Sequence, residues 1–370
     1  MRIRNNVIFV FIVVFFSFSL LNLVLSKSNR EELKGEVVVW SEEQYYDYFI
    51  RIANEFEESN RKVNIKVISV GKEEYLDKII NSDKRELPNI VQLDFMQIDK
   101  IKEKINFTEE NKDIIDKYNQ NFNESRLQQV RSNDNYYAVP FESKPIALYI
   151  REDILSEYGY ETSQLNTWDD LIEIGTEIKD KSSEEFNLFS KEDKKNISLL
   201  ISSQLVDNEE ISYSLNNVLQ TINELCNDDY ITEDSNYLYR IASLDFYNDI
   251  IKGNVIGIWE AKNPPSYNIG ENKLYDLGGK NLVALNVDKN RDTIKEFLAF
   301  AATNKELLSK ELLNNNFFPS SLFSLNIKER DNNKENIKGI SPFLLLVNVV
   351  ERAQSVKNYD RFKEVIYNLY

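Results

Sequence analysis

The sequence contains no histidine, one cysteine and only ten glycines among 370 residues. Without histidine the chain has no Ser-His-Asp or Cys-His nucleophile system and no histidine-bearing zinc site. Cys226 has no second cysteine for an internal disulfide, and its amphipathic helical surroundings predict a buried structural thiol. The few glycines form neither GxGxxG nor GxxxxGK[ST], so dinucleotide and P-loop chemistry have no support. We therefore expect no metal site, no cofactor and no enzymatic activity.

Positively charged residues are also fewer than negatively charged ones. Lysine and arginine number 45 against 61 aspartate and glutamate residues, a formal net charge of −16. A chain with no surplus of cations does not neutralise phosphates, which argues against nucleic acid as a partner. Apolar residues make up 42% and charged residues 29%, as is typical of a globular protein, and the length leaves room for two domains.

The longest uncharged run lies at the amino terminus. Nineteen mostly apolar residues, Val7–Leu25, follow Arg2 and Arg4, which orients the amino end of the segment towards the cytoplasm. The run is longer than a usual signal-peptide core and near the length that spans a membrane. Residues 1–26 are therefore a signal peptide or an uncleaved membrane anchor, and the remainder is extracytoplasmic. No cysteine follows the run, so the chain is not expected to be a lipoprotein.

Strand and helix patterns then alternate. Gly35–Trp40, Val63–Val70 and Leu87–Asp94 have the β-branched composition of buried parallel strands. Apolar residues recur at helical spacing between the first two strands, and Ser41 with Gln44 has the spacing of a capping box. Three strands and two helices within about 60 residues predict an α/β unit with a parallel sheet.

The later patterns are more varied. Thr167 is spaced to cap a helix, and residues 182–240 are largely helical in pattern. Strands are predicted at Asn254–Trp259 and Lys280–Val287. Ser341 opens a last helical region that continues, with one break, to the end of the chain.

Two prolines interrupt the apolar, tyrosine-rich run Asn135–Ile154. Pro140 and Pro145 each lack the N–H that a sheet ladder requires, so the run is not expected to form one strand. It is better interpreted as two short strands joined by an extended connector, because proline fixes the backbone angle that such a connector needs.

Several stretches, in this order, resemble the family 1 extracellular solute-binding proteins of ABC importers, the group that includes maltodextrin-binding protein. GEVVVWS is similar to the family's first strand. LPNIVQLD is similar to its P-D-[IV]-x-x-x-[DS] strand, with Asn89 in place of the usual aspartate. DNYYAVPFESKPIALYIREDIL is similar to its G-K-x-Y-A-x-P … L-x-Y-N-K-D-L segment. Further matches, which extend the resemblance over most of residues 35–370, are TWDDLIEI, GGKNLVALN with KEFLAFAATNKE, and FFPSS.

The resemblance implies a two-lobed α/β fold of the periplasmic-binding-protein type (type II), with parallel-rich sheets flanked by helices and a cleft and hinge between the lobes. After a linker at residues 27–34, it implies an N-terminal lobe of residues 35–140 and 286–325. The C-terminal lobe would comprise residues 141–285 and 326–370. Closure about three chain crossings would trap the ligand. The expected hinge residues are Pro140, Phe141, Ser143, Pro145, Leu282 and Val283.

Candidate ligand contacts come from strand ends and hinge-adjacent segments, where α/β sheets present their ligand sites. They are Trp40, Glu42, Glu43, Asp94, Phe95, Glu142, Lys144, Trp259, Glu260 and Phe343. Aromatic faces suit the C–H patches of sugars, and charged groups suit their hydroxyls. Each residue also has a simpler alternative: a ring in the core, or a charge at a helix cap or in solvent.

The leading interpretation is a monomeric receptor on the surface of a bacterium. It captures a small solute, expected to be a carbohydrate, and delivers it to the membrane subunits of an ABC permease. The alternative is a membrane-tethered sensory or interaction protein that has kept the fold and changed or lost its ligand. The missing lipobox cysteine and the altered cleft motifs favour that alternative. A third possibility is an exported glycosidase, which needs only two carboxylates. With 61 acidic residues such pairs occur by chance, so their presence is no evidence for a glycosidase.

Overall fold

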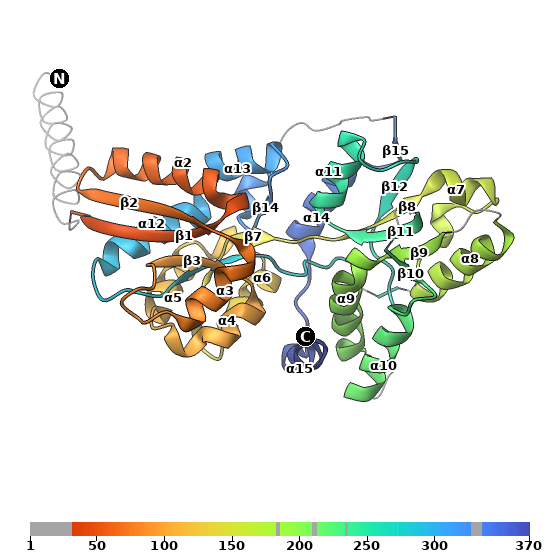
Figure 1. Ribbon diagram of the computed structural model, residues 1–370, viewed down its shortest axis with the longest axis horizontal. Helices are drawn as coiled ribbons and strands as arrows, with labels where there is room; N and C mark the ends of the chain where they lie inside the picture. The colour runs from red at the N-terminus through yellow and green to blue at the C-terminus, as the bar shows by residue number, and fades with distance from the viewer. Residues whose placement is uncertain are drawn as a thin grey trace, which may run out of the picture.

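Two lobes joined by a narrow middle make up the described part of the chain (Figure 1). The computed structural model describes residues 32–182, 186–208, 213–233, 236–268, 270–271, 273–326 and 335–370. One lobe contains a five-stranded sheet and the other a six-stranded sheet, and helices flank both (Figure 1). The predicted two-lobed α/β architecture is therefore confirmed.

The sheet of the N-terminal lobe has the strand order β2-β1-β3-β13-β6. β1 is parallel to β2 and β3, whereas β13 is antiparallel to β3 and β6. The strands are β1 (Gly35–Glu42), β2 (Val63–Val70), β3 (Ile90–Leu93), β6 (Val139–Pro140) and β13 (Asn281–Ala284). The helices of this lobe are α2 (Glu43–Ser59), α3 (Lys72–Asn81), α4 (Phe95–Ile101), α5 (Thr108–Lys117), α6 (Glu124–Val130), α12 (Arg291–Thr303) and α13 (Lys305–Leu313), with 3-10 turns η1 (Lys102–Lys104), η2 (Asn119–Asn121) and η5 (Leu322–Ser324) and a small hairpin of β4 (Arg131–Ser132) and β5 (Asn135–Tyr136).

The sheet of the C-terminal lobe has the strand order β10-β9-β11-β8-β12-β15. β8 is antiparallel to both β11 and β12, and the remaining pairs are parallel. The strands are β8 (Ala147–Arg151), β9 (Asn187–Ser190), β10 (Ile231–Thr232), β11 (Tyr237–Ala242), β12 (Trp259–Lys262) and β15 (Ile337–Lys338). The helices are α7 (Glu152–Glu157), α8 (Trp168–Lys181), α9 (Lys194–Asp207), α10 (Leu215–Leu225), α11 (Leu244–Lys252), α14 (Pro342–Arg352) and α15 (Tyr359–Leu369), with 3-10 turns η3 (Thr162–Gln164) and η4 (Lys191–Asp193).

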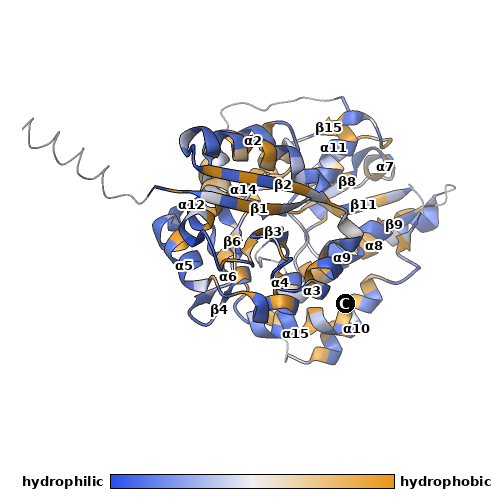
Figure 2. Ribbon diagram, turned by 60° about the vertical axis from the view of Figure 1, so that its left-hand side comes forward, coloured by the Kyte–Doolittle hydropathy of each residue, from blue (hydrophilic) through white to orange (hydrophobic). Residues whose placement is uncertain are grey.

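Each sheet separates two apolar cores, because successive side chains of a strand point to opposite faces. Val37 and Val39 of β1 lie in the core under α2, α5 and α12, whereas Trp40 lies in the core on the other face. In β8, Leu148 and Tyr149 likewise belong to different cores. Figure 2 shows hydrophobic residues along the strands and a mixed, largely hydrophilic colouring on the outer helices.

Two of the described segments connect the lobes. The first contains β7 (Glu142–Ser143), and the second is residues 276–280. β14 (Phe318–Pro319) lies between α13 and η5 of the N-terminal lobe and pairs antiparallel with β7 at the lobe junction. The chain between η5 and β15, where the remaining crossing is expected, lies largely outside the described residues. As predicted, the two prolines break the first segment. Pro140 ends β6 in the first lobe, and Pro145 makes an isolated bridge to Asp276 before β8 begins.

The predicted return crossing at Leu282 and Val283 is wrong. Both residues lie inside β13, which pairs with β3 on one side and β6 on the other. They are fully buried on opposite faces of the first sheet, so they are part of that lobe's core. The crossing instead ends at Lys280, and residues 281–285 belong to the N-terminal lobe rather than to the C-terminal lobe.

Local predictions also need correction. The strand expected at Asn254–Trp259 begins only at Trp259, because Gly253 ends α11 in the left-handed region and Gly257 has a φ of +100°. Residues 182–240 contain three strands as well as α9 and α10. Ser41 is not a helix cap: it belongs to β1, and α2 begins at Glu43. The predicted cap of α8 is confirmed, because Thr167 accepts a hydrogen bond from the amide of Asp170.

The predicted signal peptide or anchor at residues 1–26, and most of the predicted linker, lie outside the described residues. Among the helices that are described, none combines the length and the apolar character that a membrane span requires. Cys226 follows the last residue of α10 and is partly buried, and burial raises the pKa of its thiol to about 11.

Candidate functional site

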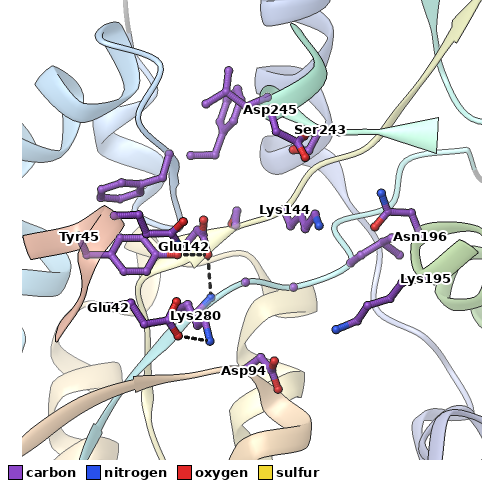
Figure 3. A pocket seen from close by; sticks show the side chains of 18 of the residues that line it. Glu42, Tyr45, Asp94, Glu142, Lys144, Lys195, Asn196, Ser243, Asp245 and Lys280 are labelled. Atoms are coloured by element: carbon purple, nitrogen blue, oxygen red, sulfur yellow. Dashed lines mark hydrogen bonds and ion pairs between the residues drawn. The ribbon is translucent and has the colours of Figure 1, made fainter. Parts of the chain in front are cut away.

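A cavity of about 570 Å³ lies between the lobes and is lined by both lobes, by the two described connecting segments and by residues next to β14 (Figure 3). We call it the interlobe cavity. The N-terminal lobe contributes the first turns of α2 and α4, and the C-terminal lobe contributes the first turns of α9 and α11. This position, at the junction of two α/β lobes, is where small-molecule sites commonly form.

The floor of the cavity is made where the connecting segments bond to one another. The backbone amides of Phe141 and Glu142 both donate to the carbonyl of Lys280, at 3.2 and 2.9 Å. The carbonyl of Phe141 accepts a 2.8 Å hydrogen bond from the amide of Ser320, and the hydroxyls of Ser143 and Ser320 lie 3.2 Å apart. These contacts tie the first connecting segment to the second and to the residues that follow β14.

Two glycines allow the second segment to pass this close. A Cβ atom on Gly279 would lie 2.4 Å from the carbonyl oxygen of Glu142, which is a backbone atom and has little freedom to move. Gly278 has a φ of +104°, a conformation that disfavours other residues. The Gly278–Gly279 pair is therefore a steric requirement of the crossing.

The N-terminal wall is a closed polar network (Figure 3). Lys280 Nζ lies 2.6 Å from Glu42 Oε1 and donates to Gln97 Oε1 at 3.0 Å. Glu142 Oε2 accepts from the hydroxyl of Tyr45 at 2.8 Å and from the amide of Lys280 at 3.0 Å. Polar groups from α2, α4 and two connecting segments are thus joined to one another.

Burial changes the acid–base behaviour of this wall. It raises the pKa of Glu142 above its usual value, although the Tyr45 hydroxyl and the Lys280 amide stabilise the carboxylate. Burial also raises the pKa of Tyr45 well above 10, so its hydroxyl stays protonated and able to donate. The Tyr45 phenol therefore does not ionise near neutral pH and keeps its hydrogen bond to Glu142.

The carboxylate of Asp94 borders the same wall and caps α4. Its Oδ1 accepts from the amide of Gln97 at 2.9 Å, and Gln97 Oε1 accepts from the amide of Asp94 at 3.0 Å. This capping box fixes the start of the helix, where Phe95 also borders the cavity. Phe95 is only 5% exposed and packs against Phe362 of α15.

The C-terminal wall is formed by the first turns of α9 and α11, and hydrogen bonds to the backbone of Ile241 join the start of α9 to β11, the strand that precedes α11. Asn196 Nδ2 donates to the carbonyl of Ile241 at 2.7 Å, and the amide of Ile241 donates to Asp193 Oδ2 at 3.1 Å. Asp193 in turn accepts from Arg240 Nε at 2.9 and 3.0 Å. Ser243 follows within two residues and borders the cavity. A buried ion pair behind the wall thus positions its polar groups.

The structure brings half of the predicted ligand contacts together. The residues that line the interlobe cavity are Glu42, Asp94, Phe95, Glu142 and Lys144, with the predicted hinge residue Ser143. Phe141 is fully buried below the floor, where it packs against Tyr45 and Phe317. The other ligand contacts lie elsewhere.

The other five predicted ligand contacts have the simpler roles: their rings lie in a core, or their charges lie in solvent or bond to another residue. Trp40 is 7% exposed in the first lobe, and Trp259 is 2% exposed and packs edge-on against Phe246. Phe343 is 1% exposed and packs in the same core as Trp259. Two acids also lie away from the lining: Glu43, which is exposed, and Glu260, which accepts from Thr162.

Several cavity residues were not predicted. They are Gln44, Tyr45, Gln97, Lys195, Asn196, Ser243, Asp245, Asn248, Lys280 and Asn316. Lys280 follows the glycine pair of GGKNLVALN, so a crossing assigned to the glycines would have identified it. Lys195 and Ser243 begin helices that are distant in sequence, and no local pattern marks them as neighbours. Among the described residues, no group of three or more acidic or cysteine side chains is placed to hold a metal ion.

The comparisons with known proteins agree with this geometry. The family model of the bacterial extracellular solute-binding proteins matches residues 40–307. A lactose-binding protein from Rhizobium radiobacter is 27% identical over 200 residues, a match that spans 48% of this chain and 46% of that protein. This chain thus covers about half the length of that curated relative.

Solved structures share the fold over nearly the whole chain. The cyclic α-maltosyl-1,6-maltose binding protein of Arthrobacter globiformis superposes with a TM-score of 0.68 at 13% identity, covering 91% of this chain and 92% of that one. The sugar-binding protein MalE of Xanthomonas citri gives a TM-score of 0.62 at 14% identity, covering 90% and 96%. With the family model matched over more than half of its length, this chain belongs to the bacterial extracellular solute-binding protein family.

Proposed function

We propose that the protein captures a small carbohydrate in the interlobe cavity by closure of the two lobes and delivers it to an ABC importer. The observation that carries the proposal is the cavity itself, which is polar and draws side chains from both lobes and from the two described connecting segments. Membership of the family supports the binding role. The ligands named for the relatives, lactose and a cyclic maltosyl-maltose, support the carbohydrate class.

Closure is supported by the way the lobes are joined. Short segments that hydrogen-bond to one another at the cavity floor permit a hinge rotation between the lobes. Glu142 belongs both to the floor and to the first segment, and Lys280 belongs both to the N-terminal wall and to the second. A ligand that contacts these groups in the cavity therefore acts directly on the segments that bend.

The place of action follows from the family and from the amino terminus. An extracellular solute-binding protein works outside the cytoplasmic membrane. The apolar run Val7–Leu25 suits a signal peptide or a tether that keeps the receptor near its permease. We infer that the permease subunits recognise the closed form, since closure is what distinguishes a loaded receptor from an empty one.

The proposal is tested by thermal shift and titration calorimetry with a panel of mono-, di- and oligosaccharides. A ligand that binds only the folded form raises the melting temperature, by an amount that grows with its concentration over Kd. Small-angle scattering should report a smaller radius of gyration for the loaded protein. Failure of every saccharide to bind or to stabilise the protein would contradict the proposal.

A pair of variants localises the binding. Asp245→Tyr places a large side chain in the cavity from the C-terminal wall and should weaken binding at least about tenfold. Glu58→Tyr changes an exposed acidic residue at the far end of α2 and should leave Kd unchanged. Equal effects of the two substitutions would place the ligand outside the interlobe cavity.

A further inference from the structure

Aromatic rings border the interlobe cavity but are almost completely buried. The exposed fractions are 1% for Tyr45, 5% for Phe95, 3% for Phe317 and 1% for Phe318. Each packs against other rings inside a lobe or at the lobe junction. Sugar stacking needs an open ring face, so charge and hydrogen bonding are left as the main means of recognition in this cavity.

The acidic side chains of the cavity are engaged within the protein. Glu42 is paired with Lys280, and Glu142 accepts from Tyr45 and from the Lys280 amide. Asp94 caps α4, and Asp245 accepts from the amide of Ser243 at the start of α11. Their negative charge is therefore largely balanced by a lysine, by helix amides or by a hydroxyl.

Lys144 is different. Its backbone is fixed on both sides, because its amide donates to Asp276 Oδ1 at 2.9 Å and its carbonyl accepts from Leu277 at 3.1 Å. The residue is partly buried, and Figure 3 shows its side chain in the cavity beside the floor. Within the described ranges, no carboxylate lies within 4.0 Å of its Nζ.

A second lysine enters from the opposite lobe. Lys195 lies in the first turn of α9, and Figure 3 shows it projecting into the same space as Lys144. The start of α9 is held by the Asn196–Ile241 hydrogen bond, so the base of this side chain is well positioned. The two lysines approach the space from a connecting segment and from the C-terminal wall.

We propose that the ligand is an acidic saccharide whose carboxylate or phosphate group binds between Lys144 and Lys195. This inference rests on the proposed function and specifies its substrate class. Closure around a ligand removes water from the cavity, and the partly buried ammonium of Lys144, with no carboxylate beside it among the described residues, then becomes costly. An oxyanion on the sugar supplies that counter-ion, whereas a neutral sugar of the same shape leaves it absent.

The test compares matched sugars that differ in whether they carry an acidic group. Titration calorimetry is run with digalacturonate against galactobiose and with trehalose 6-phosphate against trehalose, at low and high salt. We expect one acidic member to bind at least tenfold more tightly than its neutral partner, with an advantage that shrinks as salt rises. The two pairs distinguish a carboxylate from a phosphate as the group recognised.

Substitutions assign the effect to the lysines. Lys144→Gln and Lys195→Gln should each weaken binding of the acidic sugar about tenfold or more while leaving the melting temperature of the unliganded protein nearly unchanged. Lys310→Gln, on the exposed face of α13, is the matched control and should have no effect on Kd. Two lysine variants are included so that loss of folding in one leaves the other informative.

The outcomes separate this inference from the function on which it rests. Equal or tighter binding of the neutral sugars, with no loss in Lys144→Gln and Lys195→Gln, would overturn the acidic ligand and leave the carbohydrate receptor intact. Failure of acidic and neutral sugars alike, in the calorimetry and across the wider panel, would overturn both.

Discussion

The two walls of the interlobe cavity are held by different means. On the N-terminal side, Glu42 and Tyr45 bond to Lys280 and Glu142, which belong to the connecting segments. On the C-terminal side, Asn196 bonds within its own lobe. The first wall is therefore coupled to the hinge, and the second is a rigid surface that moves with its lobe.

The buried ion pair behind the C-terminal wall shows how that rigidity is produced. Arg240 is 6% exposed, and its guanidinium contacts Asp193, the hydroxyl of Tyr237 and the ring of Phe246. Asp193 is fully buried and also accepts from the Ile241 amide. Comparison of the walls suggests that damage to the C-terminal one lowers stability, whereas damage to the N-terminal one alters closure and affinity.

The largest expected effect comes from breaking the C-terminal ion pair. Arg240→Met leaves the Asp193 carboxylate buried without its partner and should lower the free energy of unfolding by about 3–5 kcal/mol, measured by urea denaturation. The double variant Asp193→Asn/Arg240→Met should recover part of that loss, because no buried charge remains. Arg131→Met, which removes an exposed pair with Glu124, should change stability by less than about 1 kcal/mol. A loss in Arg240→Met as small as that in Arg131→Met would contradict the role of the pair.

A smaller effect is expected from a substitution in the second connecting segment, residues 276–280, which bonds to the N-terminal wall. Gly279→Ala forces a Cβ against the Glu142 carbonyl and should cost about 2 kcal/mol, with a clear change in ligand affinity. Gly71→Ala is the matched control, because no atom lies within 4 Å of the added Cβ and its φ is negative. Denaturation and calorimetry report the two quantities separately. Unchanged affinity in a folded Gly279→Ala protein would show that the crossing is not coupled to binding.

The smallest effect concerns pH and the floor. Burial raises the pKa of Glu142, so the folded protein holds that proton more tightly than the unfolded chain does. Stability from this group is therefore greatest below the unfolded pKa of about 4.3 and declines as pH rises through the folded pKa. Glu142→Gln does not titrate, so its stability relative to the parent protein should increase with pH, by no more than about 1 kcal/mol. Urea denaturation from pH 4 to pH 7, with exposed Glu124→Gln as the control, measures the trend; the opposite slope would contradict it.

Local patterns predicted the parts of the cavity that sit at strand ends. Asp94 and Phe95 follow β3 directly, and Glu142 and Lys144 lie between two prolines that exclude a continuous strand. In each case the chain near the residue has a pattern that also fixes its position. Aromatic ligand contacts were harder to predict, because a buried tryptophan and a ligand-stacking tryptophan have the same sequence surroundings. Trp40 and Trp259 are core residues in the structure.

The sequence by itself determined the family, the α/β alternation of the first lobe and the break between the lobes, because these depend on periodicity, β-branched runs and the missing N–H groups of proline. Tertiary structure decided which wall each residue joins. Leu282 and Val283 are strand residues because β13 has partners on both sides, and those partners lie more than 100 residues away. Lys195 and Ser243 both lie at the cavity, and the bond between Asp193 and Arg240 joins the chain segments that precede them. Such contacts arise from long-range packing, which no local window of sequence contains.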